Sequence, residues 1–487
     1  MKITKIEVCD FRGFPGPAVY DFDFGKSRSL FIYGENGSGK SSLFRAIEEF
    51  FNRGTGGPFT NFKNTRDPSL TSGHVTVHFD DGSAQAWKHG ATRPLIQPPT
   101  SMTALQVGCL DYRSLLETNF TQRGDNVNLF DIAVRHLVPH LEVPVDGRSH
   151  PVSELWASVR YWNPAVKGHY RTYLRSCDEA LRKFNTGFEP VIKPLIDKST
   201  ELLRKFPNPD FILGLSFHPV EYDKAQRAFK YEELILSVNY SGMHIPSHHN
   251  FLNEARLSAI GLVIYLAGLL ISVPAQSPYP KLLVLDDVLV GLDMANRLPV
   301  LEILSQYFAD WQIILLTYDR VWYEMLHAEI EAKHDWRAYE LWLGADGVTP
   351  VHRHRGSGLD FFLSRALEYL AAGDDRAAAL YARAAFEAKI KSYCEKKSVR
   401  VPYKRDPKAI EAEALWNAAT GHALDNVPPA DKPALQSKFL AITTARRVVL
   451  NPLSHAAPIA ITRAEIQAAI DAVRDLTFPD IRGHVRP

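Results

Sequence analysis

The fold is decided by the stretch Gly34-Glu35-Asn36-Gly37-Ser38-Gly39-Lys40-Ser41-Ser42, which reads GxxxxGKS. An apolar run from Ser29 to Tyr33 precedes it, and Ser42 to Phe51 follows it with the apolar spacing of a helix. A strand, a glycine-rich turn and a helix in this order form a phosphate-binding P-loop. Backbone N–H groups of such a loop point at phosphates, and the helix N-terminus adds positive potential. The stretch therefore predicts a nucleotide-binding domain.

The polar residues of this loop have expected roles. Lys40 is expected to reach the β- and γ-phosphates of the nucleotide, and Ser41 to ligate Mg²⁺. The other loop residues predicted to contact the nucleotide are Gly34, Asn36, Gly37, Ser38, Gly39 and Ser42. The predicted cofactors are ATP and Mg²⁺.

Composition limits the remaining possibilities. A chain of 487 residues is too long for one hydrophobic core and should divide into roughly two to four domains. The net charge of +1 argues against a uniformly basic nucleic-acid coat but leaves a local basic groove open. The four cysteines form no CxxC pair, which favours a reducing cytoplasm. The longest apolar run, Leu257 to Val273, reads as a buried core helix, so no membrane partner is expected.

The segment before the P-loop has a recognisable order. Two alternating strand patterns, Lys2 to Val8 and Val19 to Phe24, flank the turn Asp10-Phe11-Arg12-Gly13-Phe14. Strand, turn, strand and P-loop in this order resemble the amino-terminal lobe of the RecF/SMC-type ABC ATPases, although Asp10 stands where Asn is common. In that family the arginine of the turn approaches the nucleotide, so the resemblance implies that Arg12 contacts it. An exposed turn arginine without such a contact is the alternative.

A second acidic element is expected farther along the chain. Lys281 to Asp287 is an apolar run that ends in two carboxylates, as in a Walker B strand. Asp286 is expected to hold Mg²⁺, and Asp287 to orient the attacking water. Gly291-Leu292-Asp293 resembles the D-loop of the same family. Because that family usually has Glu in place of Asp287, slow hydrolysis is expected.

The remaining nucleotide-site motifs are degenerate. Leu252 to Arg256 resembles the family's signature motif, with Asn253 in place of serine. Since that motif acts on the nucleotide of another protomer, it implies an ATP-dependent dimer or higher oligomer, whereas an ordinary N-capped helix is the alternative. Tyr318 follows the buried strand at 312–317, where the family has its switch histidine. Gln106 and Tyr112 are candidates for approaching the metal.

The rest of the chain predicts an architecture of two domains. Residues 1–343 are expected to form an α/β ABC-type P-loop ATPase, with a compact helical insertion at 151–206 broken by prolines. Strands at 211–217 and 232–240 are expected to return to its sheet. The histidines at 244, 248 and 249 are interpreted as loop surface rather than as a metal site. Residues 344–358 read as a linker, and 359–487 as an all-α bundle.

One constellation in the helical domain carries chemistry. Arg383 and Glu387 are one turn apart on one helix face, and Asn451 to His455 follows much later. The domain resembles a HEPN domain, although the strict HEPN spacing is not met, and the whole chain resembles the PrrC/RloC-type anticodon nucleases. This resemblance implies a catalytic triad of Arg383, Glu387 and His455. An ordinary ion pair and a helix-ending turn are the alternative.

These patterns lead to one functional expectation and two alternatives. RNA supplies its own 2′-OH nucleophile, so an arginine, a carboxylate and a histidine suffice for metal-independent cleavage. We expect a cytoplasmic phage-defence toxin whose nucleotide state controls a ribonuclease acting on tRNA, released by a phage trigger. The first alternative is a sensor ATPase whose helical domain docks a separate effector protein. The second alternative is a RecF-like DNA repair ATPase.

Overall fold

The structure, a computed structural model, describes residues 1–51, 57–91, 107–117, 127–165, 170–207, 211–273, 280–333, 336–344, 346–347, 349–355, 359–401, 412–450 and 462–478. The chain divides into two compact units, unit 1 at 1–354 and unit 2 at 355–487.

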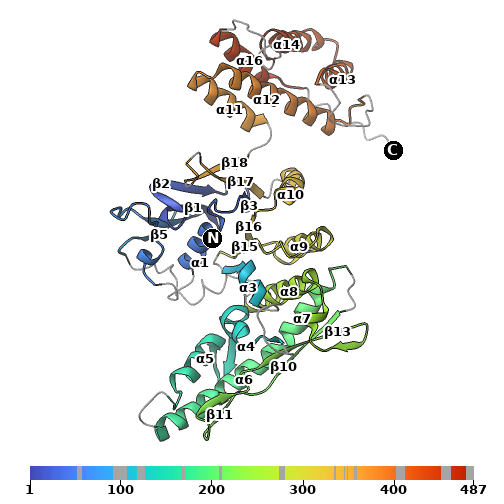
Figure 1. Ribbon diagram of the computed structural model, residues 1–487. Coiled ribbons are helices and arrows are strands. Elements are labelled where there is room, and N and C mark those ends of the chain that lie inside the picture. The colour runs from blue at the N-terminus through green and yellow to red at the C-terminus, as the bar shows by residue number, and fades with distance from the viewer. Residues whose placement is uncertain are drawn as a thin grey trace. The chain divides into compact units, whose positions relative to one another are not determined.

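A six-stranded sheet forms the centre of unit 1 (Figure 1). Its strand order is β18-β17-β3-β16-β15-β6, and the four pairs from β17 to β6 are parallel. Every residue of the three inner strands β3, β16 and β15 is buried, as their unbroken apolar runs predict. The six strands are β3 (Ser29–Gly34), β6 (Val107–Asp111), β15 (Leu282–Asp286), β16 (Gln312–Thr317), β17 (Trp336–Leu343) and β18 (Pro350–Arg355).

A second, antiparallel sheet covers the P-loop helix α1 (Lys40–Phe51). Its order is β2-β1-β4-β5, so the two predicted amino-terminal strands pair with each other. Apolar residues of α1 and of both sheets share one core, which fixes the helix between them. The four strands are β1 (Ile3–Phe11), β2 (Phe14–Asp23), β4 (His74–Phe79) and β5 (Ala84–Lys88), and a short 3-10 turn, η1 (Phe59–Asn61), precedes β4.

Three helices cover the opposite face of the central sheet: α8 (Glu254–Ser272), α9 (Met294–Tyr307) and α10 (Arg320–Lys333). In Figure 1 they follow one another along one side of the strands. Among the described residues, α8 alone has the length and apolar composition of a membrane span, and 72% of its most apolar stretch is buried inside unit 1. A core helix of a soluble domain has the same properties.

The insertion between β6 and α8 has a mixed α/β core. Its longest helix, α6 (Tyr170–Leu203), continues through Pro190 and Pro194, so the prediction that prolines break this region was wrong there. The apolar side of α6 packs into the large core of unit 1, which offsets the backbone hydrogen bonds that the prolines remove. The other elements are α3 (Tyr112–Glu117), β7 (Val127–Asn128), α4 (Phe130–Ile132), η2 (Ala133–Leu137), β8 (Glu142–Val145), β9 (Arg148–Pro151), α5 (Val152–Tyr161), β10 (Phe211–Phe217), β11 (Glu221–Asp223), β12 (Ala228–Lys230), β13 (Leu234–Tyr240), β14 (Met243–Ile245) and α7 (His248–Phe251).

Two further sequence predictions differ from the structure. Strands β10 and β13 pair with each other, with β7 and with β14 in a separate sheet, and do not return to the central one. The predicted linker at 344–358 contains β18, which extends the central sheet beside β17, so unit 1 reaches residue 354. The turn-rich composition of that segment hid a strand whose partner lies only a few residues earlier.

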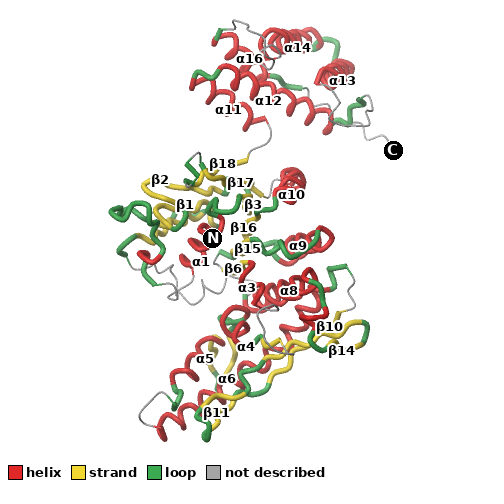
Figure 2. The backbone as a smooth tube through the Cα atoms, in the orientation of Figure 1, coloured by secondary structure: helices red, strands yellow, loops and turns green. Residues whose placement is uncertain are grey.

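Unit 2 is all-α over its described residues (Figure 2). Asp374 caps α12, because its side chain accepts a hydrogen bond from the Ala377 N–H at 3.0 Å. One core cluster joins all the helices, with Phe386 and Trp416 among its largest members. The elements are α11 (Leu359–Ala372), α12 (Asp375–Lys396), α13 (Ala412–Asp425), α14 (Lys432–Ala445), the π-helical turn η4 (Arg446–Leu450) and α16 (Arg463–Asp475).

Candidate nucleotide-binding site

The P-loop has the backbone geometry that its sequence predicts. It connects β3 to α1, and Gly37 and Gly39 have φ values of +86° and +106°. Only glycine takes such angles without strain. A Cβ atom on Gly39 would also lie 3.1 Å from the ring of Phe14, so a side chain here would require the ring to move by a few tenths of an ångström.

Lys40 lies in the mouth of the loop. Its ammonium donates to the carbonyl oxygens of Gly34 at 2.7 Å and Glu35 at 3.3 Å, and the residue is only 5% exposed. Burial lowers the pKa of Lys40, whereas the carboxylates of Asp287 and Asp286 oppose that shift. A bound phosphate could therefore take the place of these two neutral carbonyl groups and give the Lys40 ammonium a negatively charged partner.

Ser41 and Asp286 form the predicted metal pair. The Ser41 hydroxyl donates to Asp286 Oδ2 at 2.8 Å. Asp286 Oδ1 and Ser38 Oγ are buried and have no hydrogen-bond partner among the described residues. Burial raises the pKa of Asp286 to about 6, and neighbouring Asp287 adds to the shift. Because Mg²⁺ prefers oxygen ligands, this hydroxyl, carboxylate and unsatisfied oxygen fit a magnesium ion that would neutralise phosphate charge.

Asp287 is held in an unusual backbone conformation. Its φ is +56°, a left-handed angle that costs a non-glycine residue free energy. Its Oδ1 accepts a hydrogen bond from the Tyr318 N–H at 2.8 Å, and its Oδ2 lies 3.9 Å from Lys40 Nζ. Burial raises the pKa of Asp287, and Lys40 and the Tyr318 N–H oppose this. The carboxylate thus faces the P-loop lysine, where it could orient a water molecule.

Tyr318 lies beside the same lysine. Its ring centroid is 6.0 Å from Lys40 Nζ, and the residue is 41% exposed. Tyr318 is therefore next to the loop, and its contact with the γ-phosphate stays a prediction. A phenol at this position has neither of the two ring nitrogens of an imidazole.

Sequence reasoning missed Arg297, which organises the segment after β15. Its Nε donates to the carbonyl oxygens of Leu289 at 3.1 Å and Leu292 at 2.8 Å. Its Nη1 donates to Asp319 Oδ2 at 2.6 Å, directly after Tyr318. The predicted D-loop is thus tied to the end of β16. Arg297 lies inside α9, and no motif in the sequence marks it.

The signature segment has a capping role within its own chain. Asn253 caps α8, because its side chain accepts from the Arg256 N–H at 3.0 Å. Tyr112, a candidate for approaching the metal, donates to Glu254 Oε1 at 3.1 Å at the start of the same helix. The contact of Asn253 with another protomer's nucleotide stays a prediction. Gln106, the other metal candidate, lies outside the described residues.

The turn between β1 and β2, which carries Arg12, lies against Ser42. Ser42 Oγ accepts a hydrogen bond from the Gly13 N–H at 3.1 Å, so the turn lies directly against the start of α1. Arg12 itself is exposed and has a φ of +45°. The residue is therefore next to the P-loop, as the resemblance implies, and its contact with nucleotide stays a prediction.

The histidines at 244, 248 and 249 lie just before the signature segment. The interpretation as loop surface was wrong for His248, which is buried in α7. Among the described residues, no group of three or more His, Cys, Asp and Glu side chains could hold a metal ion. His248 is only 3% exposed, and burial lowers its pKa to about 4, with His249 and His244 adding to the shift. His248 is therefore neutral in the folded protein at pH 7.

This buried histidine gives a pH-dependent prediction for stability. In the unfolded chain His248 binds a proton below about pH 6.5, whereas in the folded chain it binds one only below about pH 4. Stability is therefore lost as pH falls through that window, by about 2–3 kcal/mol between pH 7.5 and 4.5. We expect His248→Asn to remove this slope in urea unfolding at the two pH values. The exposed control His218→Asn should keep it, and equal slopes in wild type and His248→Asn would contradict the assignment.

The three predicted nuclease residues are only partly described. Arg383 Nε lies 3.2 Å from Glu387 Oε1 on α12, and both side chains are about 31% exposed. Asn451 to His455 lies outside the described residues, so the structure does not test the triad. The ion pair fits both the predicted site and the alternative of an ordinary helical pair.

The fold and the site define the class of protein. A parallel sheet carries a P-loop on β3 and a carboxylate pair at the end of β15, and it brings Lys40, Ser41, Asp286 and Asp287 together. This is the arrangement of a P-loop ATPase, which binds ATP and catalyses its hydrolysis.

Comparisons with known proteins agree with that class. Residues 5–89 match the family model described as an AAA domain, and no curated protein matches the chain. A RecF–ATP structure is 12% identical and covers 73% of this chain and 98% of its own, with a TM-score of 0.44. An Smc head bound to the ScpA C-terminal winged-helix domain is 13% identical and covers 73% of this chain and 98% of its own, with a TM-score of 0.41. The SMC head of Thermotoga maritima is 14% identical and covers 73% of this chain and 100% of its own, with a TM-score of 0.33. The class rests on the P-loop and the sheet rather than on these weak likenesses.

Proposed function

We propose that unit 1 is an ABC-type ATPase of the RecF/SMC kind and that its nucleotide state controls a metal-independent ribonuclease in unit 2. The observation that carries the ATPase part is the Ser41–Asp286 hydrogen bond beside an unsatisfied, buried carboxylate oxygen. Lys40 would bind the β- and γ-phosphates, and Asp287 would orient water for attack. When bound, Mg²⁺ would neutralise charge that develops on the phosphate oxygens.

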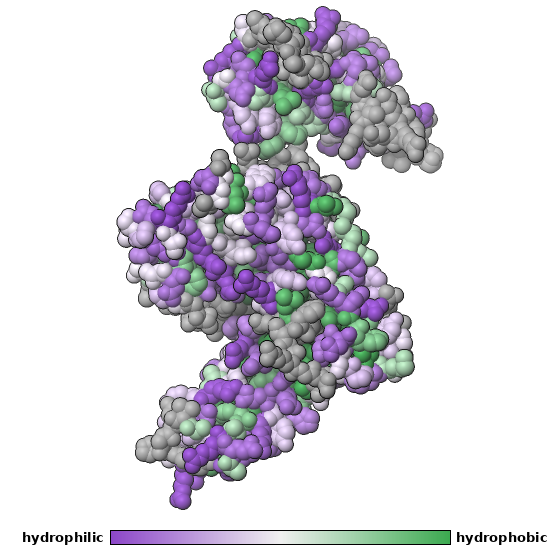
Figure 3. All heavy atoms as spheres, in the orientation of Figure 1, coloured by the Kyte–Doolittle hydropathy of each residue, from purple (hydrophilic) through white to green (hydrophobic). Residues whose placement is uncertain are grey.

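The surface beside the site supports ATP-dependent association between copies. Tyr318 and four further apolar residues are exposed on or next to α9 and α10: Met294, Leu298, Val321 and Met325. On the face drawn in Figure 3, hydrophobic atoms occur along the side of unit 1 where these helices lie. Exposed apolar residues next to a polar site are typical of interaction surfaces. A second protomer would cover them and complete the site with Asn253.

Two features of unit 2 support the ribonuclease part. Residues 355–487 contain 20 Lys and Arg against 15 Asp and Glu, so this unit is basic although the whole chain is nearly neutral. A basic unit attracts a polyanion such as tRNA. Arg383 could bind the scissile phosphate bidentately, Glu387 could hold the guanidinium, and His455 could transfer the proton of the 2′-OH. Such an enzyme would act as a toxin in phage defence, with a phage component as its trigger.

Growth and RNA integrity test this proposal. We expect cells that express wild type to stop growing and to contain fragmented tRNA when phage or phage lysate is added. Arg383→Ala and His455→Ala should remove both effects, by a factor on the order of 10² or more, because each residue acts in proton transfer or charge stabilisation. The matched control is Arg376→Ala, an exposed arginine on the same helix α12. Small-RNA sequencing reads the cleavage sites.

Other outcomes point to the two alternatives. Intact RNA in triggered cells that express an ATP-hydrolysing wild type would contradict the ribonuclease and favour a docking module for a separate effector. ATP-dependent binding of duplex DNA without cleavage would favour a repair ATPase. Fragmentation that persists in both Arg383→Ala and His455→Ala would show that another protein cuts the RNA.

A further inference from the structure

A buried carboxylate lies at the turn that carries Arg12. Asp10 is fully buried at 0% exposure, and neither of its oxygens has a hydrogen-bond partner of ordinary geometry among the described residues. Burial raises the pKa of Asp10, and the Lys63 ammonium and the Gly16 backbone N–H oppose that shift. A buried carboxylate without full hydrogen bonding costs free energy, so its retention here needs an explanation.

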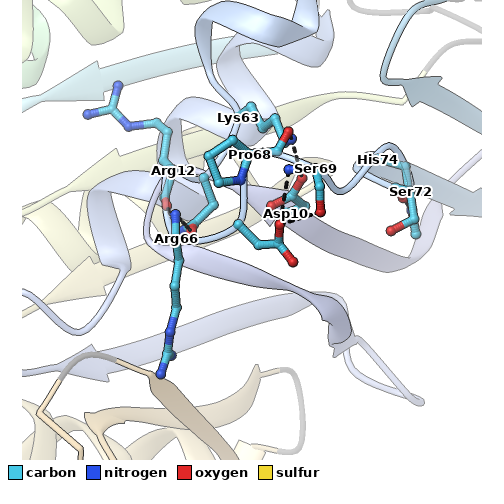
Figure 4. A network of polar contacts seen from close by, with 10 residues as sticks. Asp10, Arg12, Lys63, Arg66, Pro68, Ser69, Ser72 and His74 are labelled. Atoms are coloured by element: carbon cyan, nitrogen blue, oxygen red, sulfur yellow. Dashed lines mark hydrogen bonds and ion pairs between the residues drawn. The ribbon is translucent and has the colours of Figure 1, made fainter.

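Lys63 is the cation nearest to this carboxylate. Its Nζ lies 4.0 Å from Asp10 Oδ2, and its side chain is only 12% exposed. The same ammonium donates to the Pro68 carbonyl oxygen at 2.6 Å. Figure 4 shows Asp10, Lys63, Pro68 and Ser69 gathered on one side of the turn, while the Arg12 side chain extends away from them. Lys63 thus joins the segment that follows α1 to the interior of the turn.

The backbones of the two segments are also joined. The Arg12 N–H donates to the Phe62 carbonyl oxygen at 2.7 Å, and the Asn64 N–H donates to the Asp10 carbonyl oxygen at 3.2 Å. Asn64 Nδ2 donates to the Arg12 carbonyl oxygen. These bonds hold Asp10 and Arg12 at φ values of +50° and +45°, which non-glycine residues rarely adopt. Segment 62–68 therefore holds the turn in a strained backbone conformation through several bonds at once.

The strained turn in turn touches the P-loop. A Cβ atom on Gly13 would lie 2.9 Å from Ser42 Oγ, and the ring of Phe14 occupies the space above Gly39. A rearrangement of residues 10–12 would therefore shift Gly13 and Phe14, which contact the P-loop, and would also move the backbone from which the Arg12 side chain extends. Arg66 holds the far side of the same segment, since its Nη1 donates to Thr349 Oγ1 at 2.6 Å in the turn after β17.

We propose that Asp10 and Lys63 are positioning residues for nucleotide binding, because together they fix the turn that packs against the P-loop through Gly13 and Phe14 and that carries Arg12. This inference rests on the proposed ATPase function. Lys63 acts through Arg12 and does not touch the nucleotide. The Lys63 side chain is only 12% exposed and its ammonium already donates to the Pro68 carbonyl oxygen, unlike a solvent-exposed lysine that is free to bind phosphate.

Equilibrium titration of the purified full chain with a fluorescent ATP analogue and Mg²⁺ tests the inference. We expect Lys63→Met to raise the Kd for the nucleotide about tenfold, which is a typical size for two positions coupled through a backbone shift. The kcat at saturating ATP should change less than about twofold. Lys63→Arg should restore most of the affinity. Lys88→Met, an exposed lysine of the same sheet, is the control and should match wild type.

A double-mutant cycle separates positioning from a structural role. If Lys63 acts through Arg12, the Lys63→Met effect on Kd should disappear in an Arg12→Ala background. Asp10→Asn together with Lys63→Met should recover affinity relative to Lys63→Met, because no buried charge is then left unpaired. If Lys63→Met does not fold, Asn64→Ala is used in its place. This variant removes the hydrogen bond from Asn64 Nδ2 to the Arg12 carbonyl oxygen and leaves the Asp10–Lys63 pair intact.

The outcomes distinguish this inference from the function on which it rests. Unchanged Kd in both Lys63→Met and Asn64→Ala, with normal binding by wild type, overturns the positioning role alone. An equal effect of Lys63→Met with and without Arg12 also overturns it. If wild type binds no more nucleotide than Lys40→Ala, the ATPase proposal fails and the positioning role fails with it.

Discussion

Lys40→Ala is expected to abolish ATP binding at concentrations that saturate the wild type. The residue is buried in the loop mouth, where its ammonium holds two carbonyl oxygens that a phosphate would replace. Losing one member of such a desolvated charge pair costs about 2–5 kcal/mol, or roughly a 30- to 4,000-fold rise in Kd. Titration with a fluorescent ATP analogue and Mg²⁺ measures the loss.

The fold should survive this change. Burial already disfavours the charged Lys40, so its removal should leave the melting temperature of the apo protein almost unchanged. The exposed lysine control is Lys26→Ala, which should bind as wild type does. Binding by Lys40→Ala within threefold of wild type would contradict the assignment of the P-loop.

Asp287→Asn is expected to retain ATP and lose turnover. The carboxylate lies 3.9 Å from Lys40 and accepts a hydrogen bond from the Tyr318 N–H. An amide of the same shape can still accept from the Tyr318 N–H through its single oxygen, but it loses the ion pair with Lys40 and cannot accept a proton from water. Removing a general base lowers turnover by a factor on the order of 10² or more. The variant should therefore accumulate an ATP-bound assembly, which light scattering after size-exclusion chromatography would detect as a larger mass.

The matched control replaces an aspartate away from the site. Asp81 lies in the turn between β4 and β5, and Asp81→Asn should keep wild-type turnover and mass. An Asp287→Asn variant that hydrolyses ATP at the wild-type rate would remove Asp287 from the mechanism. A variant that no longer binds ATP would instead mean that the carboxylate serves the loop structure.

The parts of the site that lie close together in the sequence could be predicted. The P-loop needs nine consecutive residues, and their order of glycines, lysine and serine fixes both the local backbone and the chemistry. The carboxylates of β15 could also be predicted, because a buried parallel strand delivers its last residues to the same sheet edge as the P-loop. The structure brings Ser41 and Asp286 to 2.8 Å although 245 residue positions separate them.

Other parts depend on tertiary contacts that no local pattern encodes. The pair of the buried Asp10 and the half-buried Lys63 exists only because segment 62–68 folds back over the β1–β2 turn. Arg297 reads as a plain helical arginine until α9 places it against two backbone carbonyls. The strand β18 has a turn-rich surrounding sequence and forms because β17 offers it an open edge.

The helical unit shows the same division. Its helical character is predicted by the sequence, and the elements described from residue 359 onward are helical. The catalytic triad needs a distance between α12 and His455, which lies outside the described residues. Spacing in the sequence gives the pair Arg383 and Glu387, whereas a third residue from another segment depends on how the chain returns to α12.

The rate of phosphate release from ATP by the purified full chain tests the central claim most directly. Wild type, Lys40→Ala and Asp287→Asn should be measured side by side with and without Mg²⁺. We predict slow, Mg²⁺-dependent release by wild type alone, since Asp287 is short and Tyr318 replaces an imidazole. Release by wild type that equals that of Lys40→Ala would contradict the ATPase account.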